Sequence, residues 1–446
     1  MDSLIQYFKC PKRYARIEPS GALSEKSGYF RFGAETLYGK CGGPLPADSA
    51  TDPLWDAARD VHCKAETTYL PFDLTQVVDS LRNELYVEEW ASGRMKSAIA
   101  SAYYFLRPVL PVAVRKHLQR IRLRNWDRLP FPHWPVDRTV DSLMEQVLLL
   151  TLQAQNLKQI PFIWFWPEGA SSCALVTHDV ETALGTDLCP MLMDANDRFG
   201  IKASFQVIPE ERYHVTREFL DSIRRRGFEV VVHDLNHDGR LFRDRKQFVE
   251  RAAKINAYGK EFGAAGFRAG ILYRNQQWYD ALDFEYDMSV PNVAHLDPQR
   301  GGCCTVMPYF IGHVLELPVT MTQDYTLFNI LNDYSTGLWE RQIELIMEKN
   351  GLMSVVIHPD YITGSRERSM YEALLAHLAA LREKKNVWIT TPGEVNRWWR
   401  QRASMTIVEE GERLRIEGAG KERASIAYAS EKDGRLSIDF HGVCVS

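Results

Sequence analysis

Two histidines four positions apart, His233 and His237, directly follow the very apolar segment FEVVV. Imidazole nitrogen is a good zinc ligand, and the i, i+4 spacing would place both rings on one face of a helical turn. With 12 histidines among 446 residues, chance alone gives about 0.3 such pairs. The spacing therefore indicates a metal site only in company with other signals, and a surface turn with incidental histidines is the alternative.

A second apolar segment leads into two carboxylates, Asp179 and Glu181, in CALVTHDVET. If the strand continues through them, these two residues share one face, and His178 and Val180 share the other. Next to a cation, one carboxylate could bind the metal and the other could act as a general base. A helix cap or a solvated turn would explain the same pattern.

Three more polar residues stand at or after apolar segments: His358 after LMSVVI, Arg268 in GFRAG, and Asp324 after LPVTMTQ. His358 could be a general acid or an ordinary strand-end residue. The guanidinium group of Arg268 has the geometry to pair with a carboxylate. Asp324 could keep a histidine protonated.

These residues need a fold that brings several strand ends together. From about residue 172, short apolar segments alternate with helical ones, and helices are expected at 245–262, 338–349 and 370–384. This alternation predicts a parallel α/β fold, and seven or eight units in one domain favour a closed barrel. The active site of such a barrel lies at the carboxyl ends of its strands.

The remaining sequence divides around this barrel. We predict an irregular N-terminal cap at 1–94, a helical segment that packs on the barrel at 95–171, the barrel at 172–403 and a small β appendage at 404–446. The helical segment includes an expected helix at 139–157. The β appendage is predicted because apolar and polar residues alternate with period two in residues 404–446.

Composition excludes several classes of protein. Hydrophobic residues make up 45% and charged residues 25%, which is the ordinary globular balance. A net charge of −4 predicts no nucleic-acid partner. The eight cysteines form no Cys-x-x-Cys pair and are too dilute for a disulfide framework. With no apolar signal segment and no apolar run of 18 residues, we expect a cytoplasmic protein.

One segment could contact a membrane. Residues 103–114 are largely apolar, and residues 115–128 carry six Arg or Lys against one Asp. Basic charge beside apolar surface is typical of weak peripheral binding to an anionic membrane. The alternative is an amphipathic segment at 103–128 that packs its apolar side on the barrel.

In order, five segments resemble the motifs of the NodB-homology polysaccharide deacetylases, which are metal-dependent de-N-acetylases with a distorted (β/α) barrel of seven or eight units. The segments are THDVE at 177–181, HDLNH at 233–237, FRAG at 267–270, QDY at 323–325 and IHP at 357–359. They span much of residues 173–360. Five ordered matches are far more specific than any one of them.

The sequence departs from the family pattern at three motifs. Val180 replaces the second aspartate of the first motif, Ala269 and Gly270 stand where the third has its proline, and Tyr325 replaces a tryptophan. An Asp-x-Glu variant of the first motif is known in the family. By that resemblance Glu181 takes the metal-ligand role and Asp179 stays the base.

The resemblance implies a divalent metal, with zinc the first choice, held by Glu181, His233 and His237. It further implies a catalytic group in which Arg268 orients the base Asp179, and Asp324 keeps the acid His358 charged. The expected reaction removes an N-acyl group, in the first place acetyl, from an amino sugar or glycan. A catalytically inactive carbohydrate-binding relative and a hydrolase of a small non-sugar amide are the alternatives.

Overall fold

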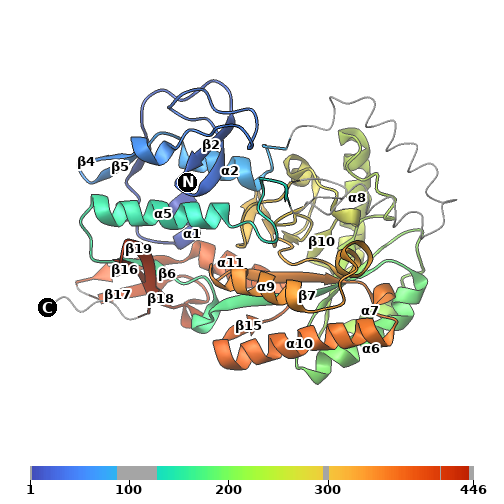
Figure 1. The fold of residues 1–446 in the computed structure, drawn as a ribbon. Helices are drawn as coiled ribbons and strands as arrows, with labels where there is room; N and C mark the ends of the chain where they lie inside the picture. The colour runs from blue at the N-terminus through green and yellow to red at the C-terminus, as the bar shows by residue number, and fades with distance from the viewer. Residues whose placement is uncertain (1–2, 88–127, 295–300, 412, 441–446) are drawn as a thin grey trace.

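A curled sheet of nine strands forms the centre of the computed structural model, which describes residues 3–87, 128–294, 301–411 and 413–440 (Figure 1). The strands are β7 (Ser172–Val180), β8 (Ser204–Val207), β9 (Glu229–His233), β10 (Gly266–Arg268), β11 (Tyr286–Asp287), β12 (Tyr309–Ile311), β13 (Val314–Glu316), β14 (Leu352–Ile357) and β15 (Val387–Ile389). All paired neighbours are parallel except β12 and β13.

The two ends of this sheet are joined by hydrogen bonds. Its order is β12-β13-β11-β10-β9-β8-β7-β14, and β15 pairs with the first half of β7. Beyond β13, the backbone N–H groups of Thr320 and Met321 donate to the carbonyl of Ser354 in β14, at 3.2 and 3.0 Å. The predicted distorted barrel is therefore confirmed.

Helices follow most of the parallel strands and cover the outer face of the sheet (Figure 1). They are α6 (Ala183–Arg198), α7 (Arg217–Arg225), α8 (Arg245–Phe262), α9 (Gly337–Met347), α10 (Ser365–Lys385) and α11 (Pro392–Ser404). Local signals mark their ends. Asp244 caps α8 by accepting from the backbone N–H of Gln247 at 2.9 Å, and Gly263 ends it with a φ of 58°.

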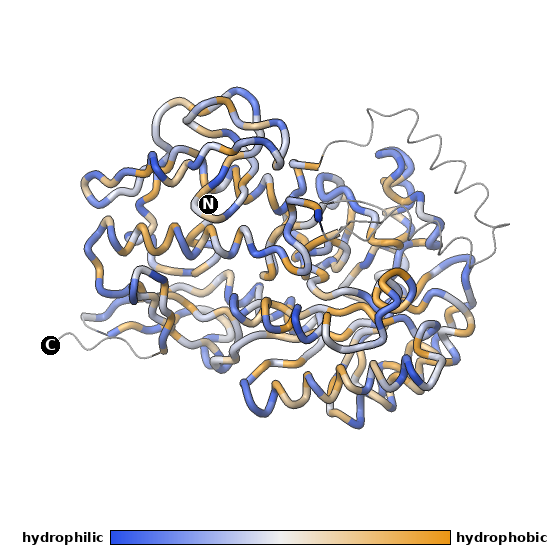
Figure 2. Tube along the Cα trace, in the orientation of Figure 1, coloured by the Kyte–Doolittle hydropathy of each residue, from blue (hydrophilic) through white to orange (hydrophobic). Residues whose placement is uncertain are grey.

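Apolar side chains fill the layer between strands and helices. One buried cluster joins Val176 and Val230 of the sheet to Leu192, Ile255 and Leu375 of the surrounding helices. Figure 2 shows strongly hydrophilic stretches on the outer turns and helix surfaces. Strands buried on both sides explain the nearly continuous apolar runs that predicted them.

The N-terminal region contains more regular structure than the sequence indicates. Its elements are α1 (Ser3–Phe8), β1 (Ile17–Pro19), β2 (Gly28–Phe32), β3 (Glu35–Gly39), β4 (His62–Lys64), β5 (Thr67–Leu70) and α2 (Leu74–Arg82). Strands of three to five residues are too short to show a hydrophobic period, which is why the segment was expected to be irregular. The domain boundary at residue 94 stays a prediction.

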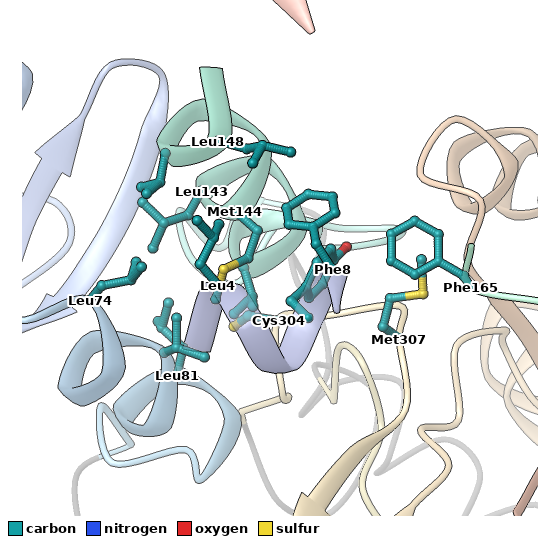
Figure 3. Close-up of a cluster of buried hydrophobic side chains, with 14 of the residues drawn as sticks. Leu4, Phe8, Leu74, Leu81, Leu143, Met144, Leu148, Phe165, Cys304 and Met307 are labelled. Carbon is teal, nitrogen blue, oxygen red and sulfur yellow. The ribbon is translucent and has the colours of Figure 1, made fainter. Parts of the chain in front are cut away.

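The N-terminal elements share a core with the barrel. In Figure 3, Leu4 and Phe8 of α1 and Leu81 of α2 pack near Leu143 and Met144 of α5 (Thr139–Ala154). The same cluster continues to interior residues near the N-terminal ends of the barrel strands, among them Leu175, Leu315 and Leu352. The N-terminal region and the barrel thus share one buried apolar cluster.

The C-terminal residues form the expected β structure. The hairpin of β16 (Thr406–Glu410) and β17 (Arg413–Glu417) precedes β18 (Ile426–Lys432) and β19 (Arg435–Asp439), and β18 also pairs with β6 (Ile160–Ile163). In the part of the chain that the structure describes, no helix has the length and apolarity to cross a membrane. The basic segment with its predicted membrane contact lies outside the described residues, apart from residue 128.

Candidate active site

The carboxyl ends of four barrel strands bring the predicted site residues to one place. Contacts between 2.7 and 3.9 Å connect them into one continuous network at these strand ends. The structure thus places together all seven residues that the sequence singled out, Asp179, Glu181, His233, His237, Arg268, Asp324 and His358.

Three of these residues form a compact cluster of potential metal ligands. Oε1 of Glu181 lies 3.0 Å from Nε2 of His237 and 3.9 Å from Nε2 of His233. One ligand atom from each residue falls within 4.8 Å of the other two. Both histidines are buried, whereas the side chain of Glu181 is 24% exposed.

The helical turn expected at His233 and His237 is wrong, because His237 lies in an irregular loop. Residues 234–239 form no helix, and Asp234 and His237 adopt φ values of 56° and 55°. Two left-handed residues turn the chain so that His233 and His237 face each other, with ring centroids 5.0 Å apart. The i, i+4 spacing therefore predicted the correct pair of residues, but the two rings are brought together by a loop and not by a helical turn.

Gly270 makes room for this loop. A Cβ atom at that position would lie 2.4 Å from Oδ2 of Asp234 and 2.9 Å from Cδ2 of His237. Both separations are below van der Waals contact, so any larger residue would push the loop away. The departure at the third motif, where glycine follows Ala269, therefore has a steric cause in this chain.

The orientation of the histidines fits a bound metal ion. Nδ1 of His233 donates to the carbonyl of Arg268 at 3.1 Å, so Nε2 carries the lone pair and faces Glu181. The buried Nε2 atoms of His233 and His237 have no hydrogen-bond partner among the described residues. Two imidazole nitrogens and one carboxylate oxygen are a ligand set typical of catalytic zinc.

Asp179 is held by a different partner. Its Oδ1 accepts from Nη1 of Arg268 at 2.7 Å, and the same nitrogen donates to Oγ1 of Thr177 at 2.8 Å. Oδ2 of Asp179 lies 3.7 Å from Nε2 of His233, on the side of the ligand cluster. Burial raises the pKa of Asp179, but the charges of Arg268, His233 and His358, together with the hydrogen bond from Arg268, outweigh burial. The pKa of Asp179 therefore falls below its ordinary value.

His358 forms a buried pair with Asp324 and also lies near Glu181. Nδ1 of His358 donates to Oδ1 of Asp324 at 2.7 Å, and Nε2 lies 3.6 Å from Oε1 of Glu181. Burial lowers the pKa of His358, but the charge of Asp324 and its hydrogen bond raise that pKa well above its ordinary value. A protonated imidazole therefore points its free nitrogen into the site.

Sequence reasoning missed two residues that shape the site. Thr177 bridges Arg268 to the neighbouring strand by donating to the carbonyl of Val355 at 2.9 Å, and Tyr361 packs on the imidazole of His358 with ring centroids 5.0 Å apart. Thr177 is the first residue of the motif THDVE, and Tyr361 lies two positions after the motif IHP. Their proximity to these motifs was the only sequence signal for them.

No family model matches the chain, and no curated protein matches its sequence. Similar solved structures include two proteins assigned to the polysaccharide deacetylases. The one from Mycobacterium smegmatis is 19% identical with a TM-score of 0.44, covering 53% of this chain and 93% of that chain. The one from Pseudomonas aeruginosa PAO1 is 13% identical with a TM-score of 0.40, covering 53% and 93%.

A third similar structure is Puue allantoinase, at 12% identity and a TM-score of 0.40, with 53% of this chain and 92% of that chain covered. The two assigned proteins carry the family name that the five sequence motifs also suggest.

Proposed function

We propose that this protein is a metal-dependent hydrolase that removes an N-acyl group, in the first place acetyl, from an amino sugar or glycan. The observation that carries the proposal is the juxtaposition of three groups at one barrel end. The ligand cluster of Glu181, His233 and His237 lies within 4 Å of a carboxylate held by Arg268 and of a histidine held by Asp324. Amide hydrolysis needs a base, an acid and an electrophile in this arrangement.

A divalent metal, with zinc the first choice for this ligand set, would polarise the acyl carbonyl and make water more acidic. Asp179 accepts the proton of the attacking water at Oδ2, because Arg268 already occupies Oδ1. The water oxygen bonds to the acyl carbon. Arg268 and Thr177 keep the carboxylate of Asp179 from rotating away.

The carbon–nitrogen bond then breaks with its electron pair on nitrogen. His358 donates the proton at Nε2 to this nitrogen, and Asp324 stabilises the charged imidazole before the transfer. The products are a free amine and a carboxylic acid. Each proton carrier lies close to the ligand cluster: Oδ2 of Asp179 is 3.7 Å from Nε2 of His233, and Nε2 of His358 is 3.6 Å from Oε1 of Glu181.

A sugar substrate is supported by the five-motif resemblance, and the alternatives differ from it in testable ways. A carbohydrate-binding relative without activity would have no use for the buried contacts of Arg268 with Asp179 and of Asp324 with His358. A hydrolase of small non-sugar amides would use the same groups. The cytoplasmic location stays a prediction.

The test measures metal content and product release together. Purified protein is depleted with a chelator and reloaded with zinc, manganese or cobalt, and acetate release is measured from N-acetylglucosamine, its oligomers and small cyclic amides. We expect about one metal ion per chain and metal-dependent acetate release from sugars. Metal-free protein without activity on any substrate would support the binding alternative, and activity on cyclic amides alone would exclude the sugar.

A further inference from the structure

The N-terminal region reaches the neighbourhood of the candidate active site through a buried ion pair. The two carboxylate oxygens of Glu84, which follows α2, accept from Nε and Nη2 of Arg274 at 2.7 and 2.5 Å. The side chain of Arg274 is 2% exposed and that of Glu84 is 12% exposed. A guanidinium group bound by both oxygens of one carboxylate has a fixed position and orientation. Glu84 lies outside residues 173–360, where the five motifs stand.

Glu84 is itself held in place by the protein around it. Its Oε1 also accepts from the backbone N–H group of Gly302 at 2.6 Å. A second contact from the same end of α2 lies beside the ion pair, since Nε2 of Gln276 donates to the carbonyl of Arg82 at 2.8 Å. The N-terminal region therefore holds the segment at 274–276 at two points.

Arg274 supports a strained turn that directly precedes it. Ile271 and Leu272 have φ values of 60° and 52°, and this left-handed conformation is unfavourable for a side chain branched at Cβ, such as that of isoleucine. Such a conformation persists only where surrounding contacts impose it. Nη1 of Arg274 donates to the carbonyl of Leu272 at 2.9 Å. One guanidinium group thus connects the turn to Glu84.

The turn packs directly against the loop that carries the ligand His237. A Cβ atom at Gly239 would lie 3.1 Å from Cδ1 of Ile271, and a Cβ atom at Gly270 would lie 2.9 Å from Cδ2 of His237. The two segments therefore touch at two places with no room to spare. A displacement of the turn would allow His237 to leave its ligand position.

We propose that Glu84 is a positioning residue for the metal site, because through Arg274 it holds the turn that keeps His237 in place as a ligand. The proposal rests on the ligand set of the proposed function and extends the support of that set into the N-terminal region. Loss of the carboxylate leaves a buried guanidinium group without its bidentate partner. The contact with the carbonyl of Leu272 then no longer has a fixed origin.

Zinc affinity and amide hydrogen exchange of the full chain test the proposal. Glu84→Gln removes the charge and keeps the size of the side chain. We expect this variant to bind zinc about tenfold more weakly, as measured by competition with a chromogenic chelator. In metal-free protein, the amides of residues 234–239 should exchange about tenfold faster, whereas those of β7 should exchange at the wild-type rate.

Variants of Arg274 show whether the ion pair acts as one unit. Arg274→Gln should weaken zinc binding as much as Glu84→Gln, and the double variant should bind no more weakly than either, because all three break the same connection. If these variants do not fold, Arg274→Lys carries the test. It keeps the charge but lacks the fork that reaches Glu84 and Leu272 together, so its zinc affinity should also fall.

Glu145→Gln is the matched control. It breaks a partly buried ion pair between α5 and Lys349, which precedes the amino end of β14, whereas the ligands lie at the carboxyl ends of strands. Zinc affinity and exchange at 234–239 should both stay at the wild-type values in this variant.

A lower free energy of unfolding in Glu84→Gln, with unchanged zinc affinity and unchanged exchange at 234–239, would overturn the proposal. The ion pair would then only attach the N-terminal region. Zinc binding by the wild type without acetate release from any substrate would contradict the proposed hydrolase alone. Weaker zinc binding and faster exchange at 234–239 in Glu84→Gln would still support the positioning role in that case.

Discussion

His358 and Asp324 are joined by two hydrogen bonds, one from the imidazole and one from the backbone. Nδ1 of His358 donates to Oδ1 of Asp324 and the N–H group of His358 donates to Oδ2, both at 2.7 Å. The carboxylate therefore fixes the ring and its main chain together. This double attachment holds the imidazole in one tautomer with Nε2 toward the site.

Asp324→Asn is expected to slow amide hydrolysis by roughly 10²–10⁴-fold, because His358 loses the charge that keeps it protonated. An aryl ester such as p-nitrophenyl acetate has a leaving group that needs no proton, so its hydrolysis should fall much less. Rates on both substrates are compared in folded protein, checked by circular dichroism. An equal loss on amide and ester would show that Asp324 has a structural role only.

Gly270→Ala is expected to lower metal affinity by roughly 10–100-fold. The new methyl group would collide with Asp234 and His237, and so displace one ligand. Gly337→Ala is the matched control, because the nearest atom to its Cβ would be Oγ of Ser335 at an ordinary 3.5 Å. Competition with a chromogenic chelator measures both affinities. Wild-type affinity in Gly270→Ala would contradict the steric role of the glycine.

Most of this site could be predicted because its residues stand at strand ends. Apolar segments followed by Asp179, His233 or His358 place these side chains at one rim of any parallel barrel. The predicted alternation of side chains along the first motif is also correct. His178 faces away from Asp179 and contacts Phe205, with ring centroids 4.7 Å apart. The helix expected at 245–262 has those bounds in the structure.

What could not be predicted depends on contacts between distant segments. Spacing alone does not distinguish a helical turn from the left-handed residues that turn the His237 loop, and Gly270, which permits that loop, is 33 positions away. Barrel closure by Thr320 and Met321 on Ser354 likewise joins segments about 30 residues apart through backbone groups, which carry no sequence signal.

His178 should make the protein less stable in acid. Burial lowers the pKa of this histidine from 6.5 to about 3, and its ring is held neutral between the carbonyl of Ile357 and the side chains of Asn196 and Tyr371. Between these pH values the unfolded chain binds more protons than the folded one, so the free energy of unfolding falls as the pH falls. At pH 5 the loss from this group is about 2 kcal/mol.

Urea unfolding at pH 8 and pH 5 measures this effect. His178→Asn should remove about 2 kcal/mol of the difference between the two pH values, whatever its effect on stability at pH 8. His214→Asn, at an exposed histidine, is the control and should leave the difference unchanged. An unchanged difference in His178→Asn would show that other groups cause the acid sensitivity.

The most direct test of the account compares Asp179→Asn with Glu181→Gln by zinc titration and acetate release on the same samples. Asp179→Asn should bind zinc with nearly wild-type affinity and lose activity by roughly 10²–10⁴-fold, because it removes the base and leaves the ligands. Glu181→Gln should weaken zinc binding at least tenfold, because it removes a ligand. Full metal affinity and activity in Glu181→Gln, with loss of zinc in Asp179→Asn, would contradict the assignment of both carboxylates.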